Sequence, residues 1–70
     1  MRLSRSGTSE TWREAEDGSE LHYELYWESA DGGLCVLGWS LDGRLIWEAD
    51  VPADVHDELM ADAWEQTRED

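Results

Sequence analysis

Between residues 8 and 51 the chain repeatedly alternates polar and apolar side chains with a period of two residues. Alternation of this period is typical of β-strands with one buried and one open face. Three Asp-Gly pairs, which favour two-residue hairpin turns, separate the alternating segments at Asp17-Gly18, Asp31-Gly32 and Asp42-Gly43. The pattern therefore predicts an antiparallel meander of four strands, near residues 8–16, 19–28, 33–41 and 44–51.

Two-residue turns at the three Asp-Gly pairs fix which side chains share a face of this sheet. The expected cross-strand neighbours are Trp12 with Tyr23, Trp27 with Val36, Leu25 with Gly38, Tyr23 with Ser40, Ser40 with Leu45, Gly38 with Trp47, and Val36 with Ala49. The three registers agree on one apolar face. It is expected to hold Trp12, Leu21, Tyr23, Leu25, Trp27, Leu34, Val36, Leu45, Trp47, Ala49 and Val51.

After Pro52 the apolar period lengthens to that of an α-helix. Val55, Leu59, Met60, Ala63 and Trp64 form one apolar stripe, which predicts a helix over residues 52–67 lying on the core face. His56 is expected at the edge of this stripe, against Trp or Met. Residues 1–7 lack a pattern and are expected to form a loose arm. Residues 1–70 are thus expected to form one α+β domain, a four-stranded antiparallel β-meander with one C-terminal α-helix (ββββα).

The opposite face of the predicted sheet combines aromatic and acidic side chains. The same registers gather there His22, Glu24, Tyr26, Glu28, Cys35, Leu37, Trp39, Arg44, Ile46, Glu48 and Asp50. An apolar centre ringed by polar groups is a common design of protein interfaces. We therefore expect this face to bind a partner, and a homodimer that stacks two such faces is the alternative.

The overall charge narrows the class of partner. The chain carries 18 Asp and Glu against 5 Lys and Arg, for a formal net charge of −13. Such a chain is repelled by nucleic acid and by anionic membranes, and it is attracted to basic surfaces. Acidic residues also recur along the helix, so the partner-binding residues are expected to be Glu24, Tyr26, Glu28, Trp39, Glu48, Asp50, Asp54, Glu58 and Asp62.

Signals for catalysis and metal binding are weak in this sequence. It has no Ser-His-Asp order, no Gly-rich phosphate loop and no nucleophile elbow. His22, His56 and Cys35 lack the spacing of metal ligands, so neither catalytic residues nor a metal or cofactor site is expected. The single cysteine and the absence of an apolar run near residue 1 predict a protein of the cytoplasm.

A small acidic domain without lysine, built from a sheet and a helix, resembles the DNA-mimic inhibitors of phages and mobile elements, including anti-CRISPR proteins. The resemblance lies in size, charge and layout. It implies an inhibitor whose carboxylates imitate the phosphate backbone and occupy a basic, nucleic-acid-binding groove in a host protein.

The acidic charge also fits two further classes of protein. A high content of Asp and Glu with scarce lysine is similar to halophilic proteins, in which acidity is an adaptation to salt and is unrelated to function. A regulatory subunit or antidote that caps a basic protein without imitating DNA is the third class.

Overall fold

The computed structural model describes residues 5–30 and 32–68, and it confirms the predicted ββββα fold. The strands are β1 (Arg5–Glu14), β2 (Glu20–Ala30), β3 (Gly33–Leu41) and β4 (Arg44–Ile46), and they form one antiparallel sheet in the order β1-β2-β3-β4. A short 3-10 turn, η1 (Glu48–Asp50), leads to the helix α1 (Ala53–Arg68).

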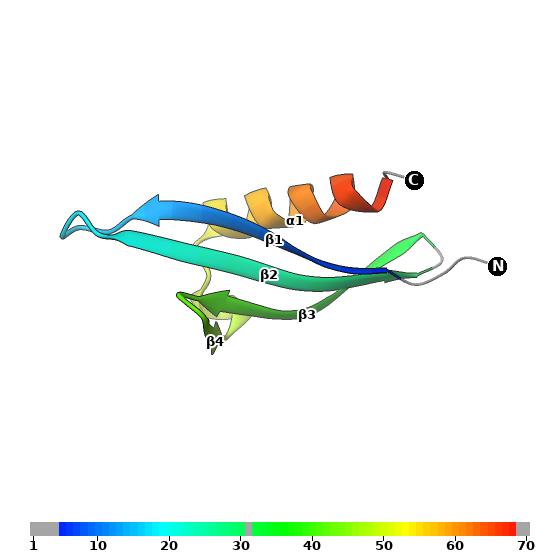
Figure 1. Ribbon diagram of the computed structural model, residues 1–70, viewed down its shortest axis with the longest axis horizontal. Helices are drawn as coiled ribbons and strands as arrows, with labels where there is room; N and C mark the ends of the chain where they lie inside the picture. The colour runs from blue at the N-terminus through cyan, green and yellow to red at the C-terminus, as the bar shows by residue number, and fades with distance from the viewer. Residues whose placement is uncertain (1–4, 31, 69–70) are drawn as a thin grey trace.

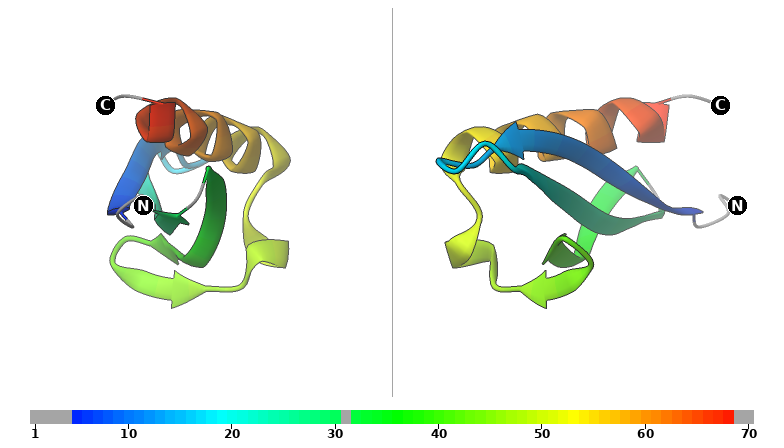
Figure 2. Two further views of the ribbon diagram at one scale, coloured as in Figure 1. Left: turned by 90° about the vertical axis from the view of Figure 1, so that its right-hand side faces the viewer. Right: turned by 60° about the vertical axis from the view of Figure 1, so that its left-hand side comes forward.

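The helix lies along one face of the long β1–β2 hairpin, and the sheet curls away from it toward β4 (Figures 1 and 2). The chain returns from β4 through η1 to the start of α1 (Figure 2). This arrangement leaves the second face of β1 and β2 uncovered by the helix. The largest changes from the predicted bounds are that β1 begins at Arg5, within the stretch expected to be a loose arm, and that β4 ends at Ile46. Residues 1–4 of that arm lie outside the described residues.

The core forms between the sheet and the helix, as the sequence predicts. The helix contributes Val55, Leu59 and Ala63, which recur at helical spacing and are fully buried. The sheet and the segment before the helix contribute Tyr23, Leu25, Trp27, Trp39 and Val51.

The first hairpin has a different register from the predicted one. A five-residue loop, 15–19, replaces the two-residue turn, and the Ala15 amide donates to the Ser19 carbonyl at 2.8 Å across it. The carboxylate of Asp17 accepts hydrogen bonds from the Ser19 amide at 3.0 Å and the Ser19 hydroxyl at 2.6 Å, which stabilises this wider loop. Thr11 therefore lies opposite Tyr23, and Trp12 lies opposite His22 on the open face.

The third strand contains a β-bulge that the alternating pattern did not reveal. Trp27 pairs with Val36, as predicted, but Tyr26 pairs with Gly38, so Leu37 is an extra residue in β3. Beyond a bulge the side chains change faces relative to a regular register. Leu25 consequently lies opposite Trp39 rather than Gly38, and Tyr23 lies opposite Leu41 rather than Ser40.

The last hairpin keeps its predicted two-residue turn. Asp42 and Gly43 have φ of 51° and 85°, as a type I′ turn requires, and Ser40 pairs with Leu45 as expected. Because β4 pairs with β3 in this fixed register, the bulge in β3 also exchanges the faces of the residues in β4. Ile46 pairs with Trp39 on the core face, whereas Leu45 lies on the open face. The predicted pairs of Trp47 with Gly38 and Ala49 with Val36 do not form, since the strand ends before them.

Candidate protein-interaction surface

Five glutamates occupy the open face of the β1–β2 hairpin. Within the hairpin register, Glu10 lies directly opposite Glu24, and Glu14 lies opposite Glu20. Like charges that face each other across a sheet are destabilising. The fifth, Glu28, follows on β2 and is exposed. These residues, which we call the glutamate stripe, are Glu10, Glu14, Glu20, Glu24 and Glu28.

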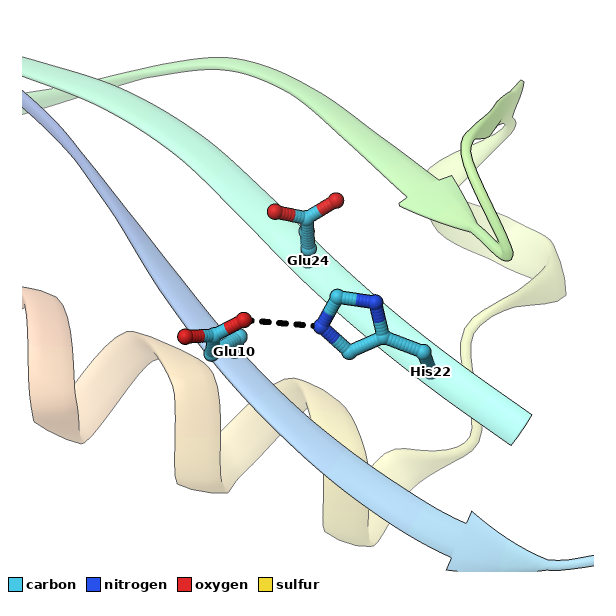
Figure 3. A group of neighbouring side chains, drawn as sticks. All are labelled: Glu10, His22 and Glu24. Atoms are coloured by element: carbon cyan, nitrogen blue, oxygen red, sulfur yellow. Dashed lines mark hydrogen bonds and ion pairs between the residues drawn. The ribbon is translucent and has the colours of Figure 1, made fainter. Parts of the chain in front are cut away.

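One histidine lies between the glutamates of this stripe. The His22 Nε2 is 2.8 Å from a carboxylate oxygen of Glu10, and Glu24 projects from the same face two residues along β2 (Figure 3). The ring of His22 stacks on Trp12, with centroids 4.6 Å apart and planes inclined by 14°. The indole of Trp12 is half exposed beside it. Acid, imidazole and indole thus lie next to one another on an accessible sheet surface.

Glu24 is more constrained than the other members of the stripe. Its carboxylate accepts a hydrogen bond from the Tyr26 hydroxyl at 3.3 Å and one from the Ser40 hydroxyl at 3.5 Å. Ser40 is only 1% exposed, although it points to the open face. The carboxylate is therefore anchored to β3 as well as to its own strand.

The predicted binding role of Trp39 depended on a wrong face assignment. Trp39 is 3% exposed and stacks on His56 of α1 with a centroid distance of 4.9 Å, whereas Trp47 is 81% exposed. The bulge at Leu37 is the physical reason, because it exchanges the faces of every residue that follows in β3. Trp12 and Leu45, also expected in the core, are exposed as well. The stacking of His56 on Trp39 agrees with its expected place at the edge of the helix.

The helix acids Asp54 and Glu58 are paired with an arginine of the sheet. Arg13 of β1 donates to Asp54 at 3.0 Å and to Glu58 at 2.6 Å, and this clamp joins the first strand to the helix. The hydrogen bond from Arg13 lowers the pKa of Asp54, and hydrogen bonds from Thr11 and then Arg13 lower the pKa of Glu58. The same contacts, with Glu58 first and Asp54 second, raise the pKa of Arg13.

The remaining predicted acids lie apart from the stripe. A carboxylate oxygen of Glu48 in η1 lies 2.8 Å from His56 Nε2, and the neighbouring Asp50 is exposed. On the helix, the Gln66 amide donates to Asp62 at 2.7 Å. Of the nine predicted partner-binding residues, the structure brings together only Glu24, Tyr26 and Glu28 on the open face.

An apolar patch lies beside the glutamate stripe, and the sequence pattern placed only one of its residues, Leu37, on this face. Leu37, Leu45 and Trp47 are 59%, 78% and 81% exposed. They line a groove of about 590 Å³ together with part of the surrounding strands. One row of cross-strand neighbours connects the stripe to the patch, because it runs across the four strands through Glu10, Glu24, Ser40 and Leu45. Leu45 was missed because the alternating pattern carries no signal for the bulge that places it on the open face.

No protein-family model, curated protein or solved structure matches this chain. Within the described part of the chain, no helix is long and apolar enough to cross a membrane.

Proposed function

We propose that this protein is a non-enzymatic binding protein of the cytoplasm that inhibits or regulates a positively charged, nucleic-acid-handling partner. The observation that carries the proposal is the glutamate stripe, in which two pairs of carboxylates face each other across one rigid hairpin. The sheet holds these charges at fixed spacing, so little conformational entropy is lost when they dock.

The spacing of the stripe supports mimicry of a phosphate backbone. From Glu20 to Glu28 the hairpin extends about 27 Å, taking about 3.4 Å per residue. Five carboxylates over that length give on average about one charge per 5 Å, gathered at three positions about 14 Å apart, against about one per 3.4 Å along a single strand of DNA. A basic groove that neutralises nucleic acid is expected to attract such an array.

The opposed glutamates also have a stability cost, which a binding role explains. Each directly opposed pair destabilises the hairpin, by an amount on the order of 0.2–1 kcal/mol. Arg13, which lies between Glu10 and Glu14 in sequence, turns to the helix instead of neutralising them. A surface selected only for stability would alternate the signs of its charges.

Apolar contact is available within this surface and at its border. Trp12 is half exposed beside His22, and the apolar patch of Leu37, Leu45 and Trp47 borders the stripe at β4. Aromatic side chains surrounded by polar groups commonly supply most of the binding energy in an interface. These residues take the anchoring role that the sequence pattern assigned to Trp39.

Capture of partners from the source cell tests the proposal. The immobilised protein should retain a nucleic-acid-binding protein, which graded salt removes and which duplex DNA displaces in competition. Glu20→Lys with Glu28→Lys should abolish retention. The matched control, Asp57→Lys with Glu65→Lys, makes the same change of charge on exposed helix positions and should retain the partner. Failure of DNA to displace the partner, or equal loss in both variants, would contradict mimicry by this face.

Salt adaptation is the second candidate, and the distribution of charge favours it in one respect. Exposed acids also lie on the helix, at Asp57, Asp62 and Glu65, away from the stripe. A protein adapted to salt should be largely unfolded at low ionic strength and folded in molar KCl, because unscreened repulsion opposes a small core. Thermal unfolding followed by circular dichroism distinguishes the two, since an inhibitor of ordinary cytoplasm should be folded at about 0.15 M salt.

A further inference from the structure

We propose that Glu10, His22 and Glu24 form a binding site for one Zn²⁺ ion on the open face of the hairpin. One donor atom from each residue lies within 4.8 Å of the other two. All three side chains project from the same side of the sheet, with the helix on the other side (Figure 3). The site shares Glu10 and Glu24 with the glutamate stripe, but its geometry would hold zinc whether or not a partner binds.

The imidazole is already oriented toward the site. Its Nε2 lies 2.8 Å from Glu10, so the ring nitrogen that would bind the metal faces a carboxylate. The stack on Trp12, with centroids 4.6 Å apart, restrains rotation of the ring. Ligands that are held in place before the metal arrives lose less freedom on binding it.

Glu24 has support from residues outside the three-residue cluster. The hydroxyls of Tyr26 and Ser40 both donate to its carboxylate, and Ser40 is buried. Hydrogen bonds of this kind orient metal ligands and contribute to affinity. Because β2 is paired on both sides, the backbone that carries His22 and Glu24 is fixed.

The donor set favours zinc over the alkaline-earth ions. One imidazole nitrogen and two carboxylate oxygens suit Zn²⁺, with water in the fourth tetrahedral position, whereas Mg²⁺ and Ca²⁺ prefer oxygen ligands alone. In a tetrahedral site with bond lengths of about 2.0–2.2 Å the donors lie about 3.3 Å from one another, so the Glu10 oxygen, which is 2.8 Å from His22 Nε2, must move slightly away from that nitrogen. The half-exposed side chain of Glu10 has the freedom to make this small movement. Two positive charges would also neutralise the opposed carboxylates of Glu10 and Glu24.

Calorimetric titration of the full chain with ZnCl₂, in a buffer that does not chelate zinc, tests the site. The wild-type protein should bind one Zn²⁺ per chain, and MgCl₂ in excess should not compete. His22→Gln, and the double variant Glu10→Gln with Glu24→Gln, should each weaken binding by about tenfold or more. Asp57→Asn with Glu65→Gln removes the same two charges from the helix and should bind zinc as the wild type does.

Nuclear magnetic resonance of the imidazole nitrogens identifies the ligand directly. Zinc should shift the Nε2 resonance of His22 and leave His56, which also has carboxylate neighbours, unchanged. Equal binding by the His22→Gln variant, displacement by Mg²⁺, or a shift at His56 instead would overturn the proposal. Each of these results would show that zinc is attracted by the general negative charge. None of them depends on whether a basic partner binds.

Discussion

Replacement of Trp39 by alanine should destabilise this protein far more than the same replacement of Trp47. Trp39 is 3% exposed, belongs to the core and stacks on His56, whereas Trp47 is 81% exposed. Removal of a buried tryptophan side chain typically costs about 3–5 kcal/mol. An exposed substitution away from such features usually changes the free energy of unfolding by less than about 0.5 kcal/mol.

The size of the protein makes this difference easy to detect. A domain of 70 residues has a total free energy of unfolding of about 3.5–10 kcal/mol. Trp39→Ala is therefore expected to remove a large share of the stability. Trp39→Leu, which keeps part of the buried volume, should remain folded with an intermediate loss.

Urea denaturation followed by far-ultraviolet circular dichroism provides the measurement. The midpoint should fall in the order wild type and Trp47→Ala, then Trp39→Leu, then Trp39→Ala. The reverse order for the two alanine variants would mean that the bulge at Leu37 is absent and that β3 and β4 have the regular register. In that case the apolar patch beside the glutamate stripe would belong to the core.

Contacts in the hairpin and the helix lead to three more predictions. The carboxyl pKa values of Asp54 and Glu58 are lowered from 3.8 and 4.5, so their contacts with Arg13 stabilise the fold above those values and lose this effect as the pH falls through the folded pKa values. The melting temperature of Arg13→Met should thus lie below that of the wild type, with the largest difference at about pH 6 and a smaller one below about pH 4. A difference that does not depend on pH would contradict the clamp. Glu20→Gln removes one opposed pair and should stabilise the protein by about 0.2–1 kcal/mol in urea denaturation, while a loss of stability would count against repulsion there. Deletion of Leu37 removes the unpaired bulge residue, and this variant should still fold, as judged by circular dichroism. Deletion of Ser40, which is paired with both neighbouring strands, should prevent folding. The opposite result would place the bulge elsewhere.

The order and type of the elements could be predicted from the sequence because each depends on local chemistry. Each of three signals involves only residues that are close in sequence: the alternating period, the Asp42-Gly43 turn and the change to helical spacing after Pro52. The core positions on β2, such as Leu25 and Trp27, follow from the same period.

The faces of the outer strands depend on single-residue shifts that local patterns do not determine. An Asp-Gly pair is compatible with a two-residue turn or with the wider loop in which Asp17 bonds Ser19. The choice between them moves Glu10 from the core face to the open face, next to His22 and Glu24. Likewise, the bulge at Leu37 allows Trp39 to pack against the helix. This packing stabilises the bulge through a tertiary contact, which cannot be predicted from the sequence of β3 alone.

The clamp of Arg13 on Asp54 and Glu58 has a consequence for the order of folding. These contacts join residues 41 and 45 positions apart, whereas the Asp42-Gly43 hairpin joins neighbours. Local hairpins form within microseconds, while closing a long segment carries a larger entropic cost. Strand β1 therefore acquires its helical cover only after the residues up to Glu58 have been synthesised. Until then the indole of Trp27 and the other core side chains of the sheet stay accessible, and transiently exposed apolar surface of this kind is prone to aggregation.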